Sequence, residues 1–217
     1  MIKLWDRVVQ FGFRLLYHEM AFTYDTVSRF VSLGDWRTWQ RSVFEFLPSP
    51  DEAGLLLELA HGTGNLQADL TDRGYASVAM DLSAQMGKIA HKKLSRQYIH
   101  PNLIRASGVA LPFGDNQFLY GVCTFPTAFI FDPKTLTELN RVIKPNGQVI
   151  IVLDGELFRR NIQTQLVDVA YTVANHRTPS DIEKRVNDRV SGYGFHPTWH
   201  KVAHKNSRSS VIILKKD

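Results

Sequence analysis

The sequence predicts an α/β fold, in which a doubly wound, mainly parallel sheet of seven strands ends in an antiparallel hairpin. Three observations predict it. From Leu55 onward, short apolar runs alternate with amphipathic stretches, as strands alternate with covering helices. The run Gln148–Leu153 is almost continuously apolar, which is typical of a strand buried on both faces. Only a polar turn separates the last two runs, and this spacing predicts the hairpin.

The first half of the sheet follows from its turn and cap residues. A strand over Leu55–Ala60 is expected to pass into a helix over Leu66–Arg73, which Gly74 ends as a C-terminal cap. Ser83 is placed to cap a helix that runs to about Leu94. The other strands are expected at Ser77–Met80, Leu103–Ala106, Tyr120–Phe125, Gln148–Leu153, Trp199–Ala203 and Ser210–Leu214.

The second half contains three further helices. Asp132 and Pro133 provide a cap and a first-turn proline for a helix over Lys134–Val142. The residues Lys144–Gly147 have the composition of a turn. Helical periodicity over Glu156–Ala174 and a capping box at Ser180–Glu183 predict the last two helices.

Two domains of unequal size are expected. Residues 1–50 are rich in aromatic side chains and helical in spacing, and they precede the first strand, so they form a helical lid or an ordinary packing segment. Residues 51–217 form the α/β domain, with a helical insertion near 156–190 that would shape the acceptor pocket.

Composition limits the compartment and the partners. The 217 residues carry 26 Lys plus Arg against 21 Asp plus Glu, and this net charge of +5 is scattered except near the C-terminal end. Nucleic acid is therefore not expected as a partner, whereas peripheral contact with a membrane is compatible with the charge. Cys123 is the single cysteine, so no internal disulfide forms and a cytoplasmic location is expected. No apolar run approaches the roughly 20 residues that span a bilayer.

A glycine turn and an acidic residue carry the strongest functional signal. Gly62 and Gly64 follow the first buried strand, where glycines allow a sharp turn and a close approach of backbone to ligand. Asp81 ends the next strand, where a carboxylate can accept both hydroxyls of a ribose. Together they predict a site for an adenosine-containing cofactor.

Dinucleotides and S-adenosylmethionine both contain adenosine. The dinucleotide fingerprint requires a small residue three positions after the second glycine, and this chain has Gln67 there. Glu58, just before the turn, would repel a diphosphate but suits a ligand that carries an ammonium or sulfonium group. The residues favour S-adenosylmethionine.

Four segments in order resemble the class I S-adenosylmethionine-dependent methyltransferases, over about Leu55–Leu153. They are the glycine-rich turn Leu57–Gly64, the acidic strand end Asp81–Ser83 with Met86 nearby, the loop Ala110–Phe118, and the helix and turn Leu139–Gly147. The resemblance implies a Rossmann-like methyltransferase fold with S-adenosylmethionine as cofactor. The sequence departs from the family pattern at Ser107–Val109, where the family often has an Asp that contacts adenine.

The N-terminal block is similar to the segment before the first strand of quinone and lipid methyltransferases of this class. Its matching stretches are Ala21–Asp25 and Val31–Trp39, and the resemblance suggests a role over the cofactor for Tyr24. Trp36 and Trp39 are expected to pack between helices. The cofactor-binding residues that the resemblance implies are Tyr24, Glu58, Ala60, His61, Gly62, Gly64, Asp81, Leu82, Met86, Ser107, Gly108, Val109, Thr124 and Phe125.

The expected reaction is methyl transfer to oxygen or carbon of a small, hydrophobic or aromatic acceptor. Direct in-line transfer requires positioning more than a dedicated base, and no catalytic residue is assigned. Phe125, Phe129 and Phe131 suit an apolar acceptor, although they also suit a core. No spacing predicts a metal site. The histidines that could act as a base are His18, His61, His176, His196 and His200.

Two other functions fit the same residues. A nucleotide-binding oxidoreductase that uses NAD(P) would share the glycine turn and Asp81. A non-catalytic protein with the methyltransferase fold would keep the fold for binding alone. Cofactor binding and turnover measurements separate the three.

Overall fold

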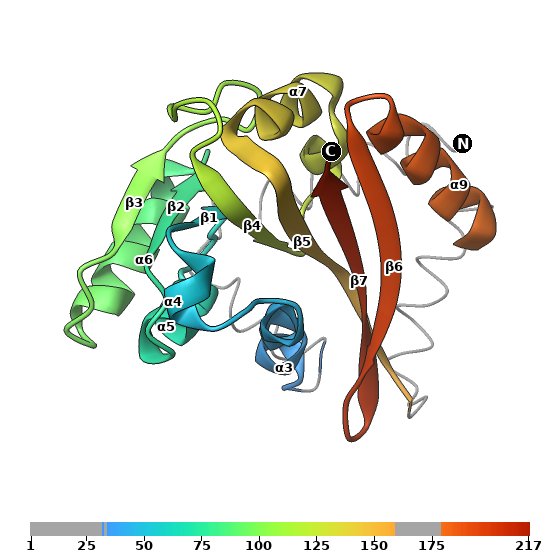
Figure 1. Cartoon of the computed structure of the whole chain (residues 1–217). Coiled ribbons are helices and arrows are strands. Elements are labelled where there is room, and N and C mark those ends of the chain that lie inside the picture. The colour runs from blue at the N-terminus through green and yellow to red at the C-terminus, as the bar shows by residue number, and fades with distance from the viewer. Residues whose placement is uncertain (1–31, 33, 159–178) are drawn as a thin grey trace, which may run out of the picture.

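The predicted sheet is confirmed by the computed structural model, which describes residue 32 and residues 34–158 and 179–217 (Figure 1). The spatial order of its strands is β3-β2-β1-β4-β5-β7-β6. The first five strands are parallel, and β7 runs antiparallel to both of its neighbours. The strands are β1 (Leu56–Leu59), β2 (Ser77–Asp81), β3 (Asn102–Arg105), β4 (Phe118–Thr124), β5 (Ile143–Leu157), β6 (Phe195–Ala203) and β7 (Ser207–Lys216).

The strand order reverses between β1 and β4. After β1 the chain adds β2 and β3 on one side, and then crosses to add β4 and β5 on the other. In such open sheets the crevice at the carboxyl ends of the strands, at this reversal, is where ligands bind. The topology therefore predicts a ligand site formed by the residues that follow β1 and β4.

Helices cover both faces of the sheet (Figure 1). Side chains alternate in direction along a strand, so Val149 and Ile151 of β5 join one core cluster while Ile150 and Val152 join the other. This confirms the doubly buried strand that the sequence predicts. The helical elements are α3 (Trp36–Gln40), the 3₁₀ helix η3 (Arg41–Glu45), α4 (Pro50–Ala53), α5 (Asn65–Asp72), α6 (Ala84–Ser95), the 3₁₀ helix η4 (Ala128–Phe131), α7 (Pro133–Val142) and α9 (Pro179–Ser191).

The described part of the N-terminal segment docks on the sheet through Trp39. Its indole Nε1 donates to Oγ of Ser207 in β7 at 2.9 Å, and the Ser207 hydroxyl donates to Asp35 at 2.7 Å. The ring lies against Gly155 of β5, at a distance that leaves no room for a β-carbon there. Trp39 is therefore a packing residue, but it packs on the sheet rather than between helices as predicted.

Two arginines fix the same segment to α5. Arg37 and Arg41 both donate to the carboxylate of Asp69 at 2.7 Å, and Arg41 adds a second bond through Nε at 3.1 Å. Asp69 is buried whereas both guanidinium groups are about half exposed. The two arginines and Trp39 hold α3 and η3 from opposite sides, so this segment has a defined position over the sheet.

Two predicted segments are wrong. The turn expected at Lys144–Gly147 is part of β5, because the β4–β5 register shifts there and the extra residues form a bulge with Asn146 at φ +63°. Glu156 and Leu157, where a helix was expected to begin, are instead the end of β5 and pair with β7. The remainder of that helix, 159–174, lies outside the described residues.

Within the described ranges, none of the helices combines the length and the apolar character that crossing a bilayer requires.

Candidate functional site

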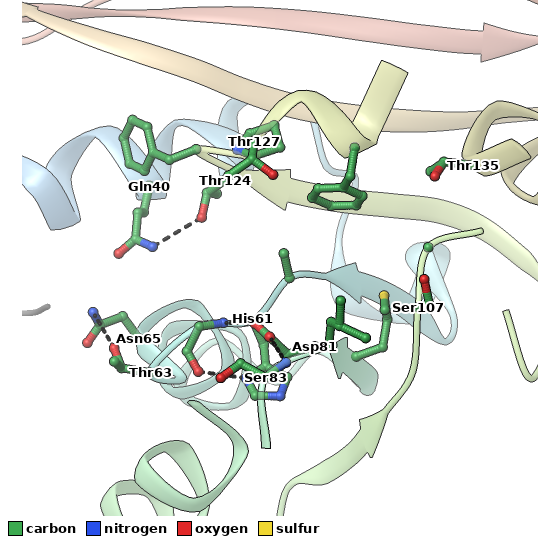
Figure 2. A pocket seen from close by; sticks show the side chains of 18 of the residues that line it. Gln40, His61, Thr63, Asn65, Asp81, Ser83, Ser107, Thr124, Thr127 and Thr135 are labelled. Atoms are coloured by element: carbon green, nitrogen blue, oxygen red, sulfur yellow. Dashed lines mark hydrogen bonds between the residues drawn. The ribbon is translucent and has the colours of Figure 1, made fainter. Parts of the chain in front are cut away.

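A cavity of about 260 Å³ opens at the carboxyl ends of the parallel strands (Figure 2). The residues after β1, β2 and β4 meet around it, together with the loop that follows β3 and one residue of α3. Its position matches the reversal of strand order described above. It is lined by Gln40, Ala60, His61, Gly62, Thr63, Asn65, Met80, Asp81, Leu82, Ser83, Ser107, Gly108, Val109, Thr124, Phe125, Pro126, Thr127, Phe129 and Thr135.

The two glycines of the turn have different roles. Both have a positive φ, +53° at Gly62 and +79° at Gly64, where a side chain is unfavourable. A β-carbon on Gly62 would meet nothing within 4 Å, and Gly62 lines the cavity. A β-carbon on Gly64 would lie 3.0 Å from Ala90 of α6. Gly62 therefore leaves space for a ligand, whereas Gly64 allows two helices to pack closely.

Two of the five described non-glycine residues with a positive φ lie at the cavity. Ala60 and Phe125 have φ values of +55° and +51°, although neither is a glycine. They directly follow β1 and β4, and both line the cavity. Such conformations cost of order 1–3 kcal/mol each and occur preferentially at functional sites. The strained pair therefore supports a functional role for this edge of the sheet.

Asp81 organises one wall. Its Oδ2 accepts a hydrogen bond from the Gly62 amide at 2.9 Å and its Oδ1 accepts one from the Ser83 amide at 2.8 Å. Each carboxylate oxygen has a second lone pair, so both can accept another donor from a ligand. Asp81 thus shapes the glycine turn and presents acceptors at the cavity.

His61 lies beside this carboxylate in the same wall (Figure 2). Its Nδ1 donates to the Gly62 carbonyl oxygen at 2.8 Å, which leaves Nε2 as the unprotonated nitrogen. Burial lowers the pKa of His61 below its ordinary value, although the charge of Asp81 opposes the shift. The imidazole is therefore neutral at pH 7. Cys123 is not a nucleophile here, because burial raises the pKa of its thiol.

A loop after β3 forms the far end of the cavity, and α7 fixes it. Arg141 donates to the carbonyl oxygens of Leu111 and Phe113 at 3.0 and 2.7 Å, and it forms ion pairs with Asp115 and Glu138. The hydrogen bonds from Arg141 lower the pKa of Glu138 and keep it ionised. The loop that carries Ser107, Gly108 and Val109 is thereby held in place.

Ten of the fourteen residues predicted to bind a cofactor line this cavity. They are Ala60, His61, Gly62, Asp81, Leu82, Ser107, Gly108, Val109, Thr124 and Phe125. Glu58, Gly64 and Met86 are not in the wall, and Tyr24 lies outside the described residues. Met86 is fully buried in α6. Of the proposed bases besides His61, His196 and His200 lie on β6 away from the cavity, and His18 and His176 lie outside the described ranges.

Glu58 lies in the interior of β1 rather than at its end. Its carboxylate accepts a hydrogen bond from the Gln67 side chain, whose carbonyl oxygen accepts one from Ser77 at 3.1 Å. Burial raises the pKa of Glu58 to about 8, and the bond from Gln67 opposes the shift. The acid therefore belongs to the packing between the sheet and α5.

Replacing Glu58 with Gln should make the protein more stable at alkaline pH. A folded-state pKa near 8, above the ordinary 4.5, means that Glu58 stabilises the fold below about pH 4.5 and that this contribution disappears as the pH rises to 8. Glu58→Gln keeps the acceptor for Gln67 without the charge. Denaturant unfolding from pH 5 to 9 should show a stability advantage of the variant that grows up to pH 8. An advantage that does not change with pH would contradict the assignment.

Sequence reasoning missed several wall residues, two of which are notable. Among the described residues, Oε1 of Gln40 and Oγ1 of Thr135 have no hydrogen-bond partner although both atoms are buried. Both residues line the cavity, Gln40 from α3 and Thr135 from α7. No sequence motif identifies either of them. A buried polar atom without a partner is unfavourable, so both atoms suit a site that is completed by a ligand.

The wall fits an adenosine cofactor that carries a cationic sulfur. The open space over Gly62 admits a ligand beside the Asp81 acceptors. The described residues that line this cavity include no Lys or Arg. The described ranges also contain no group of three His, Cys, Asp or Glu side chains placed to hold a metal ion.

Comparisons with known proteins show which family the chain belongs to. The model of the ubiE/COQ5 methyltransferase family matches residues 8–202. The chain is 30% identical over 217 residues to a demethylmenaquinone methyltransferase of Renibacterium salmoninarum. This alignment covers 92% of this chain and 88% of that protein. It is 32% identical over 145 residues to the ubiquinone/menaquinone biosynthesis C-methyltransferase UbiE of a Shewanella species.

The match to the Shewanella protein covers less of each chain. It covers 63% of this chain and 57% of the Shewanella protein, so the match spans less than two thirds of that relative. In structure, the chain resembles a Methanococcus maripaludis protein that is provisionally assigned as an S-adenosyl-L-methionine-dependent methyltransferase. The TM-score is 0.67 at 15% identity, with 92% and 94% of the two chains covered, and this likeness shows the fold. With the family model matching most of its length, the chain belongs to the ubiE/COQ5 methyltransferase family.

Proposed function

We propose that this protein uses S-adenosylmethionine to methylate a ring carbon of a quinone-type small molecule. The observation that carries the proposal is the cavity, which has Asp81 and the open turn at Gly62 on one wall and Phe125 and Phe129 on another. Family membership supports methyl transfer, and the names of the Renibacterium and Shewanella relatives support a quinone-type acceptor and carbon as the methylated atom.

The residues present would hold the cofactor by its ribose. Asp81 offers acceptors for the two ribose hydroxyls, and Gly62 allows the backbone to come close to the ligand. The carboxylate charge also favours a cation in the cavity. When bound, S-adenosylmethionine supplies a methyl group on a positively charged sulfur.

The rest of the cavity positions the acceptor. Phe125 and Phe129 give it an apolar surface that displaces water from around the reacting groups. The strained backbone at Phe125 fixes one of these rings, which also stacks on Trp36 with ring centroids 3.9 Å apart. Holding two reactants close and aligned supplies a large part of the acceleration in an in-line displacement. The described wall therefore acts mainly by positioning.

The N-terminal segment takes part in this site. Its α3 contributes Gln40 to the cavity wall and is fixed to the sheet by Trp39 and to α5 by Arg37 and Arg41. These contacts support the expectation that residues 1–50 cover the cofactor and acceptor.

Calorimetry and methyl-transfer assays test the proposal. S-adenosylhomocysteine should bind to the full chain, and NADH should not. Radiolabelled methyl should then pass from S-adenosylmethionine to 1,4-dihydroxynaphthalene kept reduced under anaerobic conditions. Tight binding of NADH without S-adenosylhomocysteine would favour the oxidoreductase. Binding of S-adenosylhomocysteine without turnover on any hydroquinone would favour a non-catalytic protein.

A further inference from the structure

One polar pair in the cavity is not needed for the proposed binding of the cofactor's ribose, although the family resemblance also implies cofactor binding for Thr124. It consists of Gln40, the last residue of α3, and Thr124, the last residue of β4. Gln40 Nε2 donates to Thr124 Oγ1 at 3.1 Å, and both side chains are more than nine-tenths buried. Figure 2 shows the pair across the cavity from His61, Asp81 and Ser83.

The pair has one acceptor and one donor left over. Among the described residues, the carbonyl oxygen Oε1 of Gln40 has no hydrogen-bond partner. The Thr124 oxygen accepts the bond from Gln40, and no other described residue accepts a bond from its hydroxyl, so the hydroxyl proton can be donated to a ligand. A group that donates one hydrogen bond and accepts another would satisfy both atoms at once. A hydroxyl group has this property.

Other ligand groups fit less well. A ring carbonyl can accept from Thr124, but it has no proton for Gln40 and would place its lone pairs against Oε1. The ammonium group of the cofactor can donate to Gln40 but cannot accept from Thr124. Of the three groups, only a hydroxyl completes the pair, and a buried polar atom left unpaired costs free energy.

Gln40 is also held in place on both sides along the chain. The preceding residue, Trp39, is hydrogen-bonded to Ser207, and the following residue, Arg41, makes two hydrogen bonds to Asp69. Next to the pair, Phe125 lines the cavity and stacks on Trp36. A fixed carbonyl oxygen beside an aromatic surface is suited to a hydroxyl group on a planar ring.

We propose that Gln40, with Thr124, is a specificity-determining pair that binds a ring hydroxyl of the methyl acceptor and so selects the hydroxyl-bearing form over the carbonyl form. The inference rests on the proposed function, since it assigns a contact to the acceptor of that reaction. Gln40 acts as a positioning residue and takes no part in bond making.

The test measures binding to the full chain saturated with S-adenosylhomocysteine. The probes are 1,4-dihydroxynaphthalene under anaerobic conditions and 1,4-dimethoxynaphthalene, which keeps the ring but has no hydroxyl proton. By calorimetry the wild type should bind the dihydroxy compound at least tenfold more tightly. Equal affinities, or failure of the dihydroxy compound to bind, would overturn the assignment without any variant.

Two variants locate the preference at Gln40. Gln40→Met keeps the length of the side chain without the acceptor and should remove most of the tenfold preference, whereas Gln40→Glu keeps an acceptor oxygen and should retain it. Both should bind S-adenosylhomocysteine within twofold of the wild type. If Gln40→Met weakens S-adenosylhomocysteine as strongly as the dihydroxy probe, the residue serves the cofactor and the proposal fails. Absence of S-adenosylhomocysteine binding in the wild type would instead overturn the proposed function.

Discussion

Replacing Gly155 with Ala is expected to lower the free energy of unfolding by about 3 kcal/mol, at the upper end of overpacking effects. A β-carbon at this position would lie 2.0 Å from Cδ2 of Trp39, well inside van der Waals contact. The indole cannot move aside freely, because it is buried and its nitrogen is bonded to Ser207. The variant must therefore displace α3 from the sheet or distort β5.

Gly121→Ala is the matched control. Gly121 lies in β4, next to β5, and its β-carbon would meet Ile143 and Val149 at 3.5 Å, which is ordinary contact. Its unfolding free energy should stay within about 1 kcal/mol of the wild type. Thermal melts should show a loss of roughly 6 to 12 °C for Gly155→Ala. A melt like that of Gly121→Ala would mean that Trp39 does not pack on Gly155 as described.

The spacing of apolar residues along the sequence, together with the helix-capping residues, was sufficient to predict the sheet. The apolar run in β5 and the helix caps at Ser83 and Asp132 are set by residues close together in the sequence, and they lie where they are expected. The Ser83 hydroxyl accepts a hydrogen bond from the Met86 amide, and the Asp132 carboxylate accepts one from the Lys134 amide. The ends of β5 were not predictable in this way. Its extension to Leu157 depends on pairing with β7, some 50 residues later, which turn composition does not encode.

The site residues likewise divide into those that local sequence predicts and those that only tertiary contacts bring to the cavity. Gly62 and Asp81 were found because a strand end and a turn are visible in sequence, and the structure places both at the cavity. Glu58 was expected near the ligand, but it lies inside β1, two residues before the cavity residue Ala60. Because side chains alternate between the two faces of a strand, its carboxylate points toward Gln67 of α5. Gln40 was missed because its approach to Thr124 is set by tertiary contacts of Trp39 and Asp69.

Replacing Asp81 with Ala is expected to weaken S-adenosylhomocysteine binding by about 1–3 kcal/mol, which is roughly five- to 150-fold in the dissociation constant. The variant removes the acceptors proposed for the ribose hydroxyls, and it also frees the Gly62 and Ser83 amides that Asp81 holds. Glu58→Gln, which changes a buried acid on the neighbouring strand outside the cavity wall, should bind within twofold of the wild type. Calorimetry measures all three proteins.

The loss of affinity in Asp81→Ala has two sources, and an analogue separates them. S-adenosylhomocysteine without its ribose 2′-hydroxyl cannot donate that bond, so the wild type should bind the analogue several-fold more weakly than the parent compound. In Asp81→Ala the acceptor is absent, and the two compounds should bind with equal affinity, because coupling between a ligand group and a side chain vanishes when either is removed. A collapsed glycine turn would weaken both compounds alike and leave their ratio as it is in the wild type. A ratio unchanged by the substitution would therefore reject the contact between Asp81 and the ribose.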